Sequence, residues 1–282
     1  MKHALIMEGG AMRGLFTCGV MDVLMEEGIV FEGGAGISAG AVFGVNYKSR
    51  QAGRPLRYNL AFCKDPRYGT VRSVLKTGDL FDADFCYRAI PDELDIFDRN
   101  AFKENPMEFY IGATDVETGK AVYHLCTDGG STDTDWMRAS ASMPLVSRPV
   151  EIEGHCYLDG GIADSVPYRF MESRGYEKNV IILTQPADYR KKISTAMPLL
   201  RLFMKQYPAI IDAMAVRHTV YNHQIEETRK RESEGRAFVI CPPAPLPVSR
   251  MTHDPAKLQE TYNIGREEMQ KHISSLKEFL NN

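Results

Sequence analysis

The sequence predicts an α/β domain built on a mainly parallel central sheet with helical cap elements. Residues 4–7 and 179–184 are short apolar runs, as expected for strands that are buried on both faces of such a sheet. A glycine-rich turn at residues 8–14 joins the first run to a helical pattern, which is how an α/β unit begins. A second strand leads into Gly36-Ile37-Ser38-Ala39-Gly40, and open α/β sheets place their chemistry at such carboxyl strand ends.

Length and composition narrow the class of protein. The 282 residues suit one large α/β domain, with a motif-bearing core at about residues 4–185 and further helical and strand elements at about 190–282. Hydrophobic residues make up 44% and charged residues 25%, as in ordinary globular proteins. The net charge of −3 provides no basic excess for nucleic acid. No apolar run approaches the ~20 residues of a membrane span, and the first run is too short for a signal peptide.

The cysteine pattern bears on metal binding and on the compartment. No two of the six cysteines have C-x-x-C spacing, so we expect no zinc site. Scattered thiols in a chain of this length are typical of a reducing environment. We therefore expect a cytoplasmic protein, with peripheral contact at the inner face of the membrane as an additional hypothesis. The cysteines are Cys18, Cys63, Cys86, Cys126, Cys156 and Cys241.

The elements of the first part follow in order. A helix is expected over residues 15–27, with Gly28 as its stop, and a strand over residues 28–35. Residues 55–105 interleave Arg, Asp, Tyr and Phe without a clear period, so we expect helices and loops that cap the sheet. Their aromatic side chains are candidates for an acyl or aromatic pocket, and ordinary packing is the simpler alternative for each of them.

In the second part we expect a hairpin at residues 108–126, a helix at 135–142 and a hairpin at 150–158. A helical stretch broken near Pro208 is expected at residues 196–231, followed by a strand at 237–241 and a helix at 255–280. The helical stretch carries an apolar stripe that we interpret as core-facing, with membrane docking as the alternative. The stripe consists of Leu200, Phe203, Tyr207, Ile210 and Met214. Two basic clusters, at residues 190–192 and 229–231, are interpreted as solvated faces rather than as lipid contacts.

Ser38 is the candidate nucleophile. It lies between Gly36 and Gly40 in the form G-x-S-x-G, the nucleophile elbow of serine hydrolases. A serine hydroxyl is a weak nucleophile unless a sharp turn exposes it beside a base. The flanking glycines allow that turn, and the helix that follows directs backbone N–H groups at developing negative charge. Because these residue types are common, the pentapeptide needs support from the rest of the chain.

The glycine-rich turn at residues 8–14 has three interpretations. A dinucleotide site requires G-x-G-x-x-G, but Ala11 occupies its third position and no acidic residue follows convincingly at the end of the next strand. A phosphate-binding Walker loop requires Gly-Lys-Ser/Thr, which this turn lacks. An oxyanion hole requires only convergent backbone N–H groups near a nucleophile, and this interpretation is favoured. A plain tight turn is the third alternative.

The base that would serve Ser38 is either a histidine or an aspartate. Of the seven histidines, His253 is the best candidate for a conventional triad because it precedes the last helix in a loop. Asp159 is the stronger candidate, because Gly160 and Gly161 allow an exposed, tightly turned carboxylate at the end of a hairpin strand. Partial desolvation would raise its proton affinity. A simple turn is the alternative interpretation of Asp-Gly-Gly.

Four blocks in this order and spacing resemble those of the patatin-like phospholipases. They are Gly9-Gly10-Ala11-Met12-Arg13-Gly14, Gly36-Ile37-Ser38-Ala39-Gly40, Ala141-Ser142-Met143-Pro144 and Asp159-Gly160-Gly161. The resemblance implies a three-layer α/β/α fold, lipid acyl-ester hydrolysis by a Ser–Asp dyad, and no metal or organic cofactor. By position it makes Ser38 the nucleophile and Asp159 the base. The loop of Gly9, Gly10, Ala11, Met12, Arg13 and Gly14 would form the oxyanion hole, chiefly through Gly10 and Ala11.

One departure from the family pattern concerns Ala11, which stands where the family usually has a third glycine. The backbone N–H survives this change, but alanine does not take a positive φ without strain. The resemblance implies a phospholipase A or lysophospholipase that works through an acyl-enzyme on a lipid ester substrate. The alternatives are a transacylase with the same dyad, an α/β-hydrolase esterase with a histidine-containing triad, and a non-catalytic lipid-binding protein.

Overall fold

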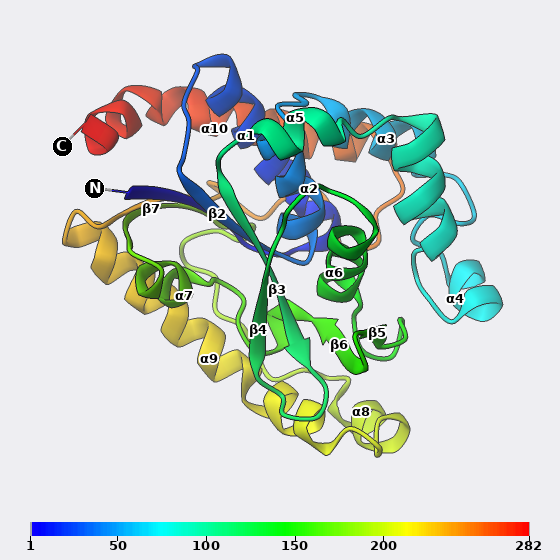
Figure 1. The fold of residues 1–282 in the computed structure, drawn as a ribbon. Coiled ribbons are helices and arrows are strands. Elements are labelled where there is room, and N and C mark those ends of the chain that lie inside the picture. The colour runs from blue at the N-terminus through cyan, green and yellow to red at the C-terminus, as the bar shows by residue number, and fades with distance from the viewer. Residues whose placement is uncertain (1, 282) are drawn as a thin grey trace.

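A central sheet of eight strands organises the chain in this computed structural model, which describes residues 2–281 (Figure 1). The strand order is β5-β6-β3-β2-β1-β7-β8, and β4 pairs with β3. The mutually parallel strands are β1 (Lys2–Met7), β2 (Gly33–Ile37), β3 (Glu108–Asp115), β7 (Tyr176–Ile182) and β8 (Ala237–Ile240). β4 (Ala121–Leu125) and β6 (His155–Asp159) pair antiparallel with β3, and β5 (Val150–Ile152) pairs antiparallel with β6.

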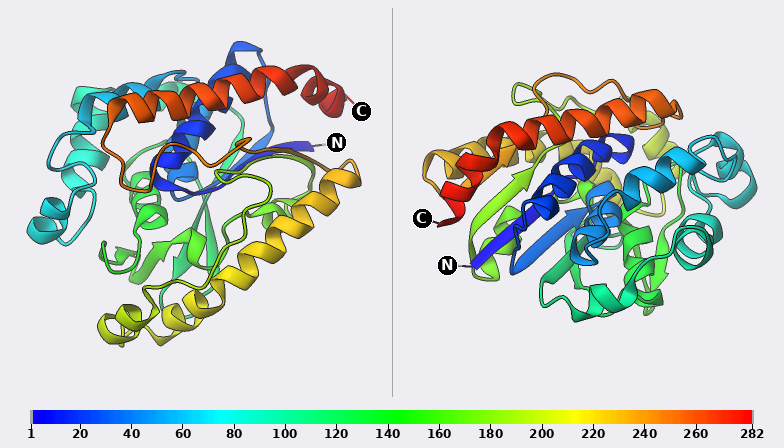
Figure 2. Two further views of the ribbon diagram at one scale, coloured as in Figure 1. Left: turned by 180° about the vertical axis from the view of Figure 1, so that it is seen from behind. Right: turned by 90° about the horizontal axis from the view of Figure 1, so that it is seen from above.

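Helices cover both faces of the sheet, as the two views of Figure 2 show. Alternate residues of β1 point to opposite faces. Leu5 and Met7 join a buried cluster with α1 (Gly14–Glu26), α2 (Ala39–Lys48) and α10 (Pro255–Asn281). Ala4 and Ile6 join a second cluster with α7 (Tyr168–Ser173) and α9 (Pro208–Ser233). The predicted three-layer α/β/α fold with a mainly parallel sheet is confirmed.

The segment between α2 and β3 is helical and irregular, as its sequence predicted. Its elements are α3 (Arg54–Phe62), α4 (Val71–Thr77), the π-helix η2 (Phe85–Leu94) and α5 (Arg99–Glu104). Its aromatic residues pack into the same cluster as α1 and α2, including Tyr58, Tyr68 and Phe85. The segment therefore builds a wall beside α2 that rests on the main core.

One edge of β3 carries two strands placed end to end. β2 pairs with β3 from Gly33 opposite Glu108 to Ile37 opposite Gly112. β6 takes over at the next position, with Asp159 opposite Ala113. Because β4 occupies the other edge over the same stretch, the end of β2 and the end of β6 face each other. A Cβ at residue 160 would overlap the Gly112 carbonyl, so only glycine allows this close approach.

Several element boundaries differ from the predicted ones. β2 begins at Gly33 rather than at residue 28, because the chain first turns at Gly28 with a φ of +67°. The helix α6 (Ser131–Ala141) begins earlier than residue 135, since Asp133 accepts hydrogen bonds from the N–H groups of Thr127, Asp128 and Gly129 and organises the turn before it.

The predicted break near Pro208 is confirmed, and it separates α8 (Met197–Phe203) from α9. The apolar stripe predicted across this break is only partly core-facing. Leu200 and Ile210 are buried, but the Phe203 side chain is 64% exposed. Among residues 2–281, no helix combines the length and the apolar character that a membrane span requires.

Candidate active site

Ser38 lies at a sharp strand-to-helix turn between β2 and α2. Its backbone adopts a φ of 55° and a ψ of −121°, a strained conformation for serine that costs roughly 1–3 kcal/mol. The two flanking glycines are required sterically. A Cβ at residue 36 would overlap the Gly40 carbonyl, and a Cβ at residue 40 would overlap the carbonyl of Met7 in β1. The turn is thus held tightly against the ends of two strands, which is the geometry of a nucleophile elbow.

Ser140 in α6 fixes this turn to β3. Its hydroxyl accepts a hydrogen bond of 2.8 Å from the Ser38 N–H and donates one of 2.6 Å to the Gly112 carbonyl. Two residues later, the Ser142 carbonyl accepts a 2.8 Å hydrogen bond from the Asp159 N–H. The block around residues 141–144 therefore positions both ends of the site. Sequence inspection found this block but missed Ser140, which directly precedes it.

Asp159 ends β6 on the same cavity as Ser38, and it is 6% exposed. Its Oδ1 accepts a 2.8 Å hydrogen bond from the Gly161 N–H. Burial raises the pKa of the Asp159 carboxyl above its ordinary value, because the charged form loses hydration. The charge of Arg217 and the neighbouring Ser38 hydroxyl act in the opposite direction and lower that pKa. Burial thus makes the carboxyl a stronger base than a solvated aspartate, and it lies on the same cavity as the serine.

Arg217 in α9 is a site residue that the sequence did not reveal. Its Nε donates a hydrogen bond to the carbonyl of Gly161, and its charge acts on Asp159. Helix α9 has 26 residues and carries several other basic residues. No feature of the neighbouring sequence distinguishes Arg217 from them. Only the packing of α9 against the turn after β6 brings it to the site.

The glycine-rich loop after β1 runs directly against the elbow. A Cβ at residue 9 would lie 2.8 Å from the Ser38 Cβ, so the loop touches the candidate nucleophile. Ala11 adopts a φ of 49°, the strained conformation that its sequence made unfavourable. In the hydrogen bonds formed among residues 2–281, the N–H groups of Gly10 and Ala11 have no acceptor. These two groups are therefore available to a ligand at Ser38.

The other loop residues shape the same region. Met12 is buried, and the Arg13 side chain points to the cavity that contains Asp159. A Cβ at residue 14 would approach the Phe43 ring to 2.8 Å, so Gly14 permits α1 to pack on α2. All of the predicted oxyanion-loop residues thus lie at, or directly support, the turn that faces Ser38.

Ser38 lines two cavities that differ in the number of charged side chains they carry. The first is mainly apolar and extends between α2, the segment from α3 to α5, and α6. Its lining includes Val42, Phe43, Tyr58, Tyr68, Phe81, Tyr87, Ile90 and Met137. The second contains Asp159 and is lined by several charged side chains, namely Glu8, Arg13, Lys191, Arg217 and Arg250. The cap aromatics Tyr68, Phe81 and Tyr87 do line a pocket, as their sequence allowed.

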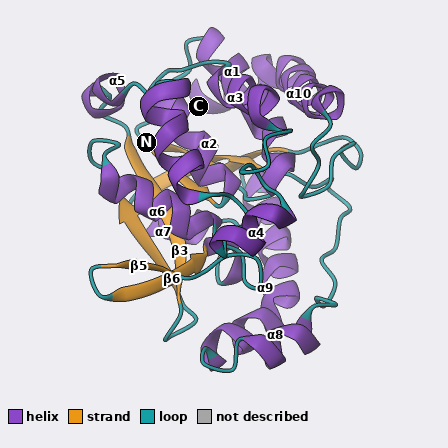
Figure 3. Ribbon diagram, turned by 90° about the vertical axis from the view of Figure 1, so that its right-hand side faces the viewer, coloured by secondary structure: helices purple, strands orange, loops and turns teal. Residues whose placement is uncertain are grey.

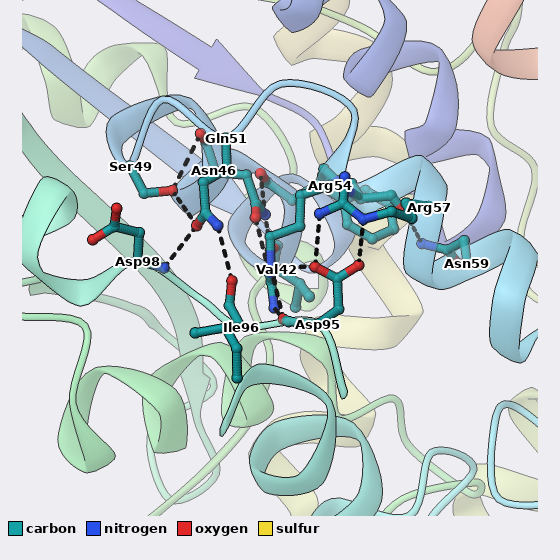
Figure 4. Close-up of polar contacts among 12 residues, drawn as sticks. Val42, Asn46, Ser49, Gln51, Arg54, Arg57, Asn59, Asp95, Ile96 and Asp98 are labelled. Carbon is teal, nitrogen blue, oxygen red and sulfur yellow. Dashed lines mark hydrogen bonds and ion pairs between the residues drawn. The ribbon is translucent and has the colours of Figure 1, made fainter. Parts of the chain in front are cut away.

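A polar network closes the apolar cavity where Arg54 reaches its lining (Figure 4). The Arg54 Nη1 donates to Asn46 Oδ1 at 2.9 Å, and its Nε lies 3.3 Å from Asp95 Oδ1. The Arg57 Nε lies 2.7 Å from Oδ2 of the same carboxylate. The Gln51 Nε2 donates a hydrogen bond of 2.9 Å to the Ile96 carbonyl. These contacts tie α2 and α3 to the chain that follows η2, so the far wall of the cavity is firmly fixed.

His253 does not line either cavity. Its Nδ1 lies 2.7 Å from the Cys63 carbonyl oxygen, which gives the ring a structural partner in the cap. The basic clusters are also not simply solvated faces. Lys191 lines the cavity with Asp159, and Arg231 forms ion pairs with Glu172 and Glu227. The interpretation of these clusters as solvated was therefore wrong for both residues.

One group of side chains has the donor atoms of a metal site. His124, Cys126 and Asp133 place one such atom each within 4.8 Å of the others. Asp133, however, already accepts hydrogen bonds from His124 Nε2 at 2.7 Å and from three backbone N–H groups. Because that carboxylate is saturated and none of the three residues lines the Ser38 cavities, the group serves to hold the turn before α6.

Comparisons with known proteins agree with this arrangement. The patatin-like phospholipase family matches residues 5–171, and a domain of unknown function (DUF6363) matches residues 207–281. The uncharacterized protein YjjU of Escherichia coli is 27% identical over 270 residues, which cover 94% of this chain and 75% of YjjU. The lysophospholipase nte1 of Aspergillus niger is 29% identical over 185 residues, which cover 61% of this chain and 11% of that protein.

Two further similarities concern a second group of relatives and the fold. An uncharacterized NTE family protein of Mycobacterium tuberculosis is 28% identical over 166 residues, covering 59% of this chain and 44% of that protein. VipD of Legionella pneumophila has a similar fold, with a TM-score of 0.50 and 13% identity over 97% of this chain and 67% of VipD. Since the family match covers more than half of the sequence, the chain belongs to the patatin-like phospholipase family and is a lipid ester hydrolase.

Proposed function

We propose that the chain is a phospholipase A or lysophospholipase that uses Ser38 as nucleophile and Asp159 as general base. The observation that carries this proposal is the meeting of Ser38 and Asp159 on one cavity, where burial raises the pKa of the Asp159 carboxyl. A carboxylate of raised pKa binds a proton more strongly than a solvated aspartate does, which suits it to accept the proton of an attacking hydroxyl.

The reaction has two steps. Asp159 accepts the Ser38 proton while Ser38 Oγ forms a bond to the ester carbonyl carbon, and the resulting oxyanion accepts hydrogen bonds from the N–H groups of Gly10 and Ala11. The alcohol leaves with that proton and the acyl group stays on Ser38. Water then gives a proton to Asp159 and attacks the acyl carbonyl, and the fatty acid is released as Ser38 regains its proton.

The two cavities suggest how a lipid would lie. The apolar cavity beside Ser38 is lined by aliphatic and aromatic side chains and suits an acyl chain. The cavity with Asp159 is charged and suits the polar part of the lipid. A relative named as a lysophospholipase supports this substrate class.

The alternatives predict different behaviour. A transacylase would use the same acyl-enzyme and pass the acyl group to another alcohol instead of water. A triad based on His253 is disfavoured, because that ring is bonded to the Cys63 carbonyl and lines neither cavity. A non-catalytic lipid-binding protein would have no need for the strained elbow at Ser38.

Peripheral contact with a membrane is part of the proposal. In α8, Leu200 lines the cavity that contains Asp159, while Leu199, Leu202 and Phe203 are exposed. Helix α4 lies on the same side of the molecule, the face that Figure 3 shows, and its Leu75 is 85% exposed. Exposed apolar side chains beside the mouth of a lipid cavity would insert at the membrane surface. The substrate would then enter without crossing water.

A fluorophosphonate probe tests the nucleophile. The probe should add one label to the wild-type protein by intact mass, and Ser38→Ala should take up none. Ser194→Ala is the matched control, because its hydroxyl lines the same cavity but is bonded to the Ala196 N–H, and this variant should still take up one label. Labelling that persists in Ser38→Ala would remove this serine from the mechanism.

A further inference from the structure

The charged cavity beside Ser38 contains four basic side chains from four separate segments. Arg13 comes from the glycine-rich loop, Lys191 from the chain between β7 and α8, Arg217 from α9, and Arg250 from the chain between β8 and α10. Three of them lie outside residues 5–171, the part that matches the patatin-like phospholipases. Two of them, Arg217 and Arg250, lie within residues 207–281, the domain of unknown function.

None of these four cations has an acidic partner. The ion pairs within 4.0 Å that the described part of the chain forms include neither Arg13 nor Lys191, Arg217 or Arg250. The Nε of Arg13 is fully buried and has no hydrogen-bond partner among residues 2–281. Arg13, Lys191 and Arg217 are partly buried, and Arg250 is exposed at the edge of the cavity. Cations that are shielded from water are ordinarily paired, so this group is suited to bind an anion.

The two carboxylates of the cavity do not satisfy the cations. Glu8 Oε2 accepts hydrogen bonds from the N–H of Thr184 at 2.6 Å and from its hydroxyl at 3.2 Å. Asp159 is bonded to Gly161 and is needed as a base. Four cations thus face two carboxylates that are already engaged, which leaves an excess of positive charge in the cavity.

Two of the cations are held in place before any ligand arrives. The backbone N–H of Lys191 donates to Asn222 Oδ1 at 2.8 Å, and its Nζ lies 4.0 Å from the centre of the Tyr221 ring. Arg217 is anchored by its hydrogen bond to the Gly161 carbonyl. Burial, reinforced by the charge of Arg217, lowers the pKa of Lys191 to about 7. A bound anion would offset that effect and restore the charge of the lysine.

We propose that Lys191, Arg217 and Arg250, with Arg13, bind the phosphate group of the lipid substrate, and that the C-terminal region of unknown function thereby completes the active site. This inference rests on the proposed hydrolysis at Ser38. In a glycerophospholipid the ester carbonyl and the phosphate are separated by the short glycerol unit. A phosphate held in the charged cavity therefore places the carbonyl at Ser38 and the acyl chain in the apolar cavity. Guanidinium groups suit this role because they bind phosphate oxygens in pairs.

The test compares two esters with the same decanoyl chain, one with a phosphate and one without. We would measure kcat/KM for decanoyl lysophosphatidylglycerol and for monodecanoylglycerol. Arg250→Gln and Lys191→Met should each lower the ratio of the two values at least tenfold, mainly through the KM of the phosphate ester. Arg190→Gln is the matched control, because it removes an exposed charge next to Lys191 that does not line the cavity, and it should leave the ratio unchanged. A ratio that stays unchanged in both cavity variants would overturn the proposal.

A binding measurement separates this inference from the proposed hydrolysis. Calorimetry with Ser38→Ala protein should show at least tenfold tighter binding of decanoyl lysophosphatidylglycerol than of monodecanoylglycerol, and adding Arg250→Gln should remove the difference. If the wild type hydrolyses neither ester but this difference is present, the hydrolysis fails and the phosphate site stands. If inorganic phosphate binds the Ser38→Ala protein as tightly as the lysolipid does, the site serves the free anion, and the assignment to the substrate is overturned.

Discussion

Ile37 and Asp159 pair with neighbouring residues of the same strand, Gly112 and Ala113 of β3, and from the same edge. Ser38 follows Ile37 directly, so the end of β2 delivers the serine to the point where β6 delivers the aspartate. Ser140 bridges this junction through its bonds to the Ser38 N–H and the Gly112 carbonyl. Ser38 and Asp159 are thus positioned by the pairing of three strands rather than by flexible loops.

This geometry predicts that an aspartate, and not a histidine, is required for ester hydrolysis. Asp159→Asn keeps the shape of the turn but cannot accept a proton, so kcat for a short-chain ester should fall by about 10²–10⁴ with little change in KM. His253→Ala removes a ring that is bonded to the Cys63 carbonyl, and activity should stay within about tenfold. Steady-state kinetics with circular dichroism would check both. Near-normal kcat in Asp159→Asn would reject Asp159 as the base.

Arg217 should set the acidic limit of activity. Asp159 must be ionised to act as a base, and the positive charge of Arg217 lowers its pKa against the effect of burial, with a smaller contribution from Arg250. Activity is lost as the pH falls through the pKa of Asp159. In Arg217→Gln that pKa rises further, so the loss should begin at a higher pH than in the wild type.

Arg217→Lys is the matched variant, because it keeps the charge but loses the Nε hydrogen bond to the Gly161 carbonyl. The pH at which this variant loses activity on the acidic side should remain close to that of the wild type, even if the maximal rate falls. The measurement is kcat/KM for a neutral ester across the acidic range. If kcat/KM falls at the same pH in Arg217→Gln and in the wild type, the charge of Arg217 does not act on Asp159.

The strained alanine of the oxyanion loop gives a prediction about stability. Ala11 adopts a φ of 49°, which costs an L-residue roughly 1–2 kcal/mol, whereas the added chain freedom of a glycine costs about 0.4–1 kcal/mol. Ala11→Gly should therefore raise the free energy of unfolding by up to about 1.5 kcal/mol and keep activity within about threefold. Ala215→Gly inside α9 is the control and should lose about 1 kcal/mol. Urea unfolding measures both, and a clear loss in Ala11→Gly would contradict the strain argument.

The network at the far end of the apolar cavity should contribute strongly to stability. The Arg54 side chain is 5% exposed, and Asp95→Ala would remove its acidic partner while Asn46 and the backbone carbonyl of residue 95 still accept hydrogen bonds. Breaking a buried pair costs about 3–5 kcal/mol, and we expect the lower end of this range. Arg57→Ala removes a 59% exposed partner of the same carboxylate and should cost under about 1 kcal/mol. Similar losses in the two variants by urea unfolding would refute a special role for the buried pair.

The exposed apolar face of α8 should determine binding to lipid vesicles. Leu202 and Phe203 are 55% and 64% exposed, and burying each in a bilayer surface would contribute about 1.5–3 kcal/mol. Changing both to serine should lower the partition constant at least tenfold in a sedimentation assay with phosphatidylglycerol vesicles. Val30→Ser, at an equally exposed site before β2, should change it little. Undiminished binding of the α8 variant would remove α8 from the membrane contact.

The order of elements could be predicted from the sequence because it depends on local pattern. Apolar runs such as residues 179–182 mark strands that are buried on both faces, and the glycine blocks mark turns that only glycine allows. The four motif blocks also indicated Ser38, Asp159 and the loop of Gly10 and Ala11, because close backbone approach and a sharp elbow restrict the residue types at those positions. Boundaries were less accurate, since a cap such as the one at Asp133 depends on distant partners.

The tertiary structure alone decided which charged side chains reach the site. Lys191, Arg217 and Arg250 come from segments without a motif, and in the sequence they resemble any solvated cation. Their proximity depends on the packing of α9 across the sheet and on the course of the chain on either side of β8. Electrostatic interactions act through space, so the sequence positions of the charged residues that meet at the site follow no repeating pattern. For this reason the sequence by itself determined the fold and the proposed pair of Ser38 and Asp159, whereas the charged surroundings of these two residues followed only from the packed structure.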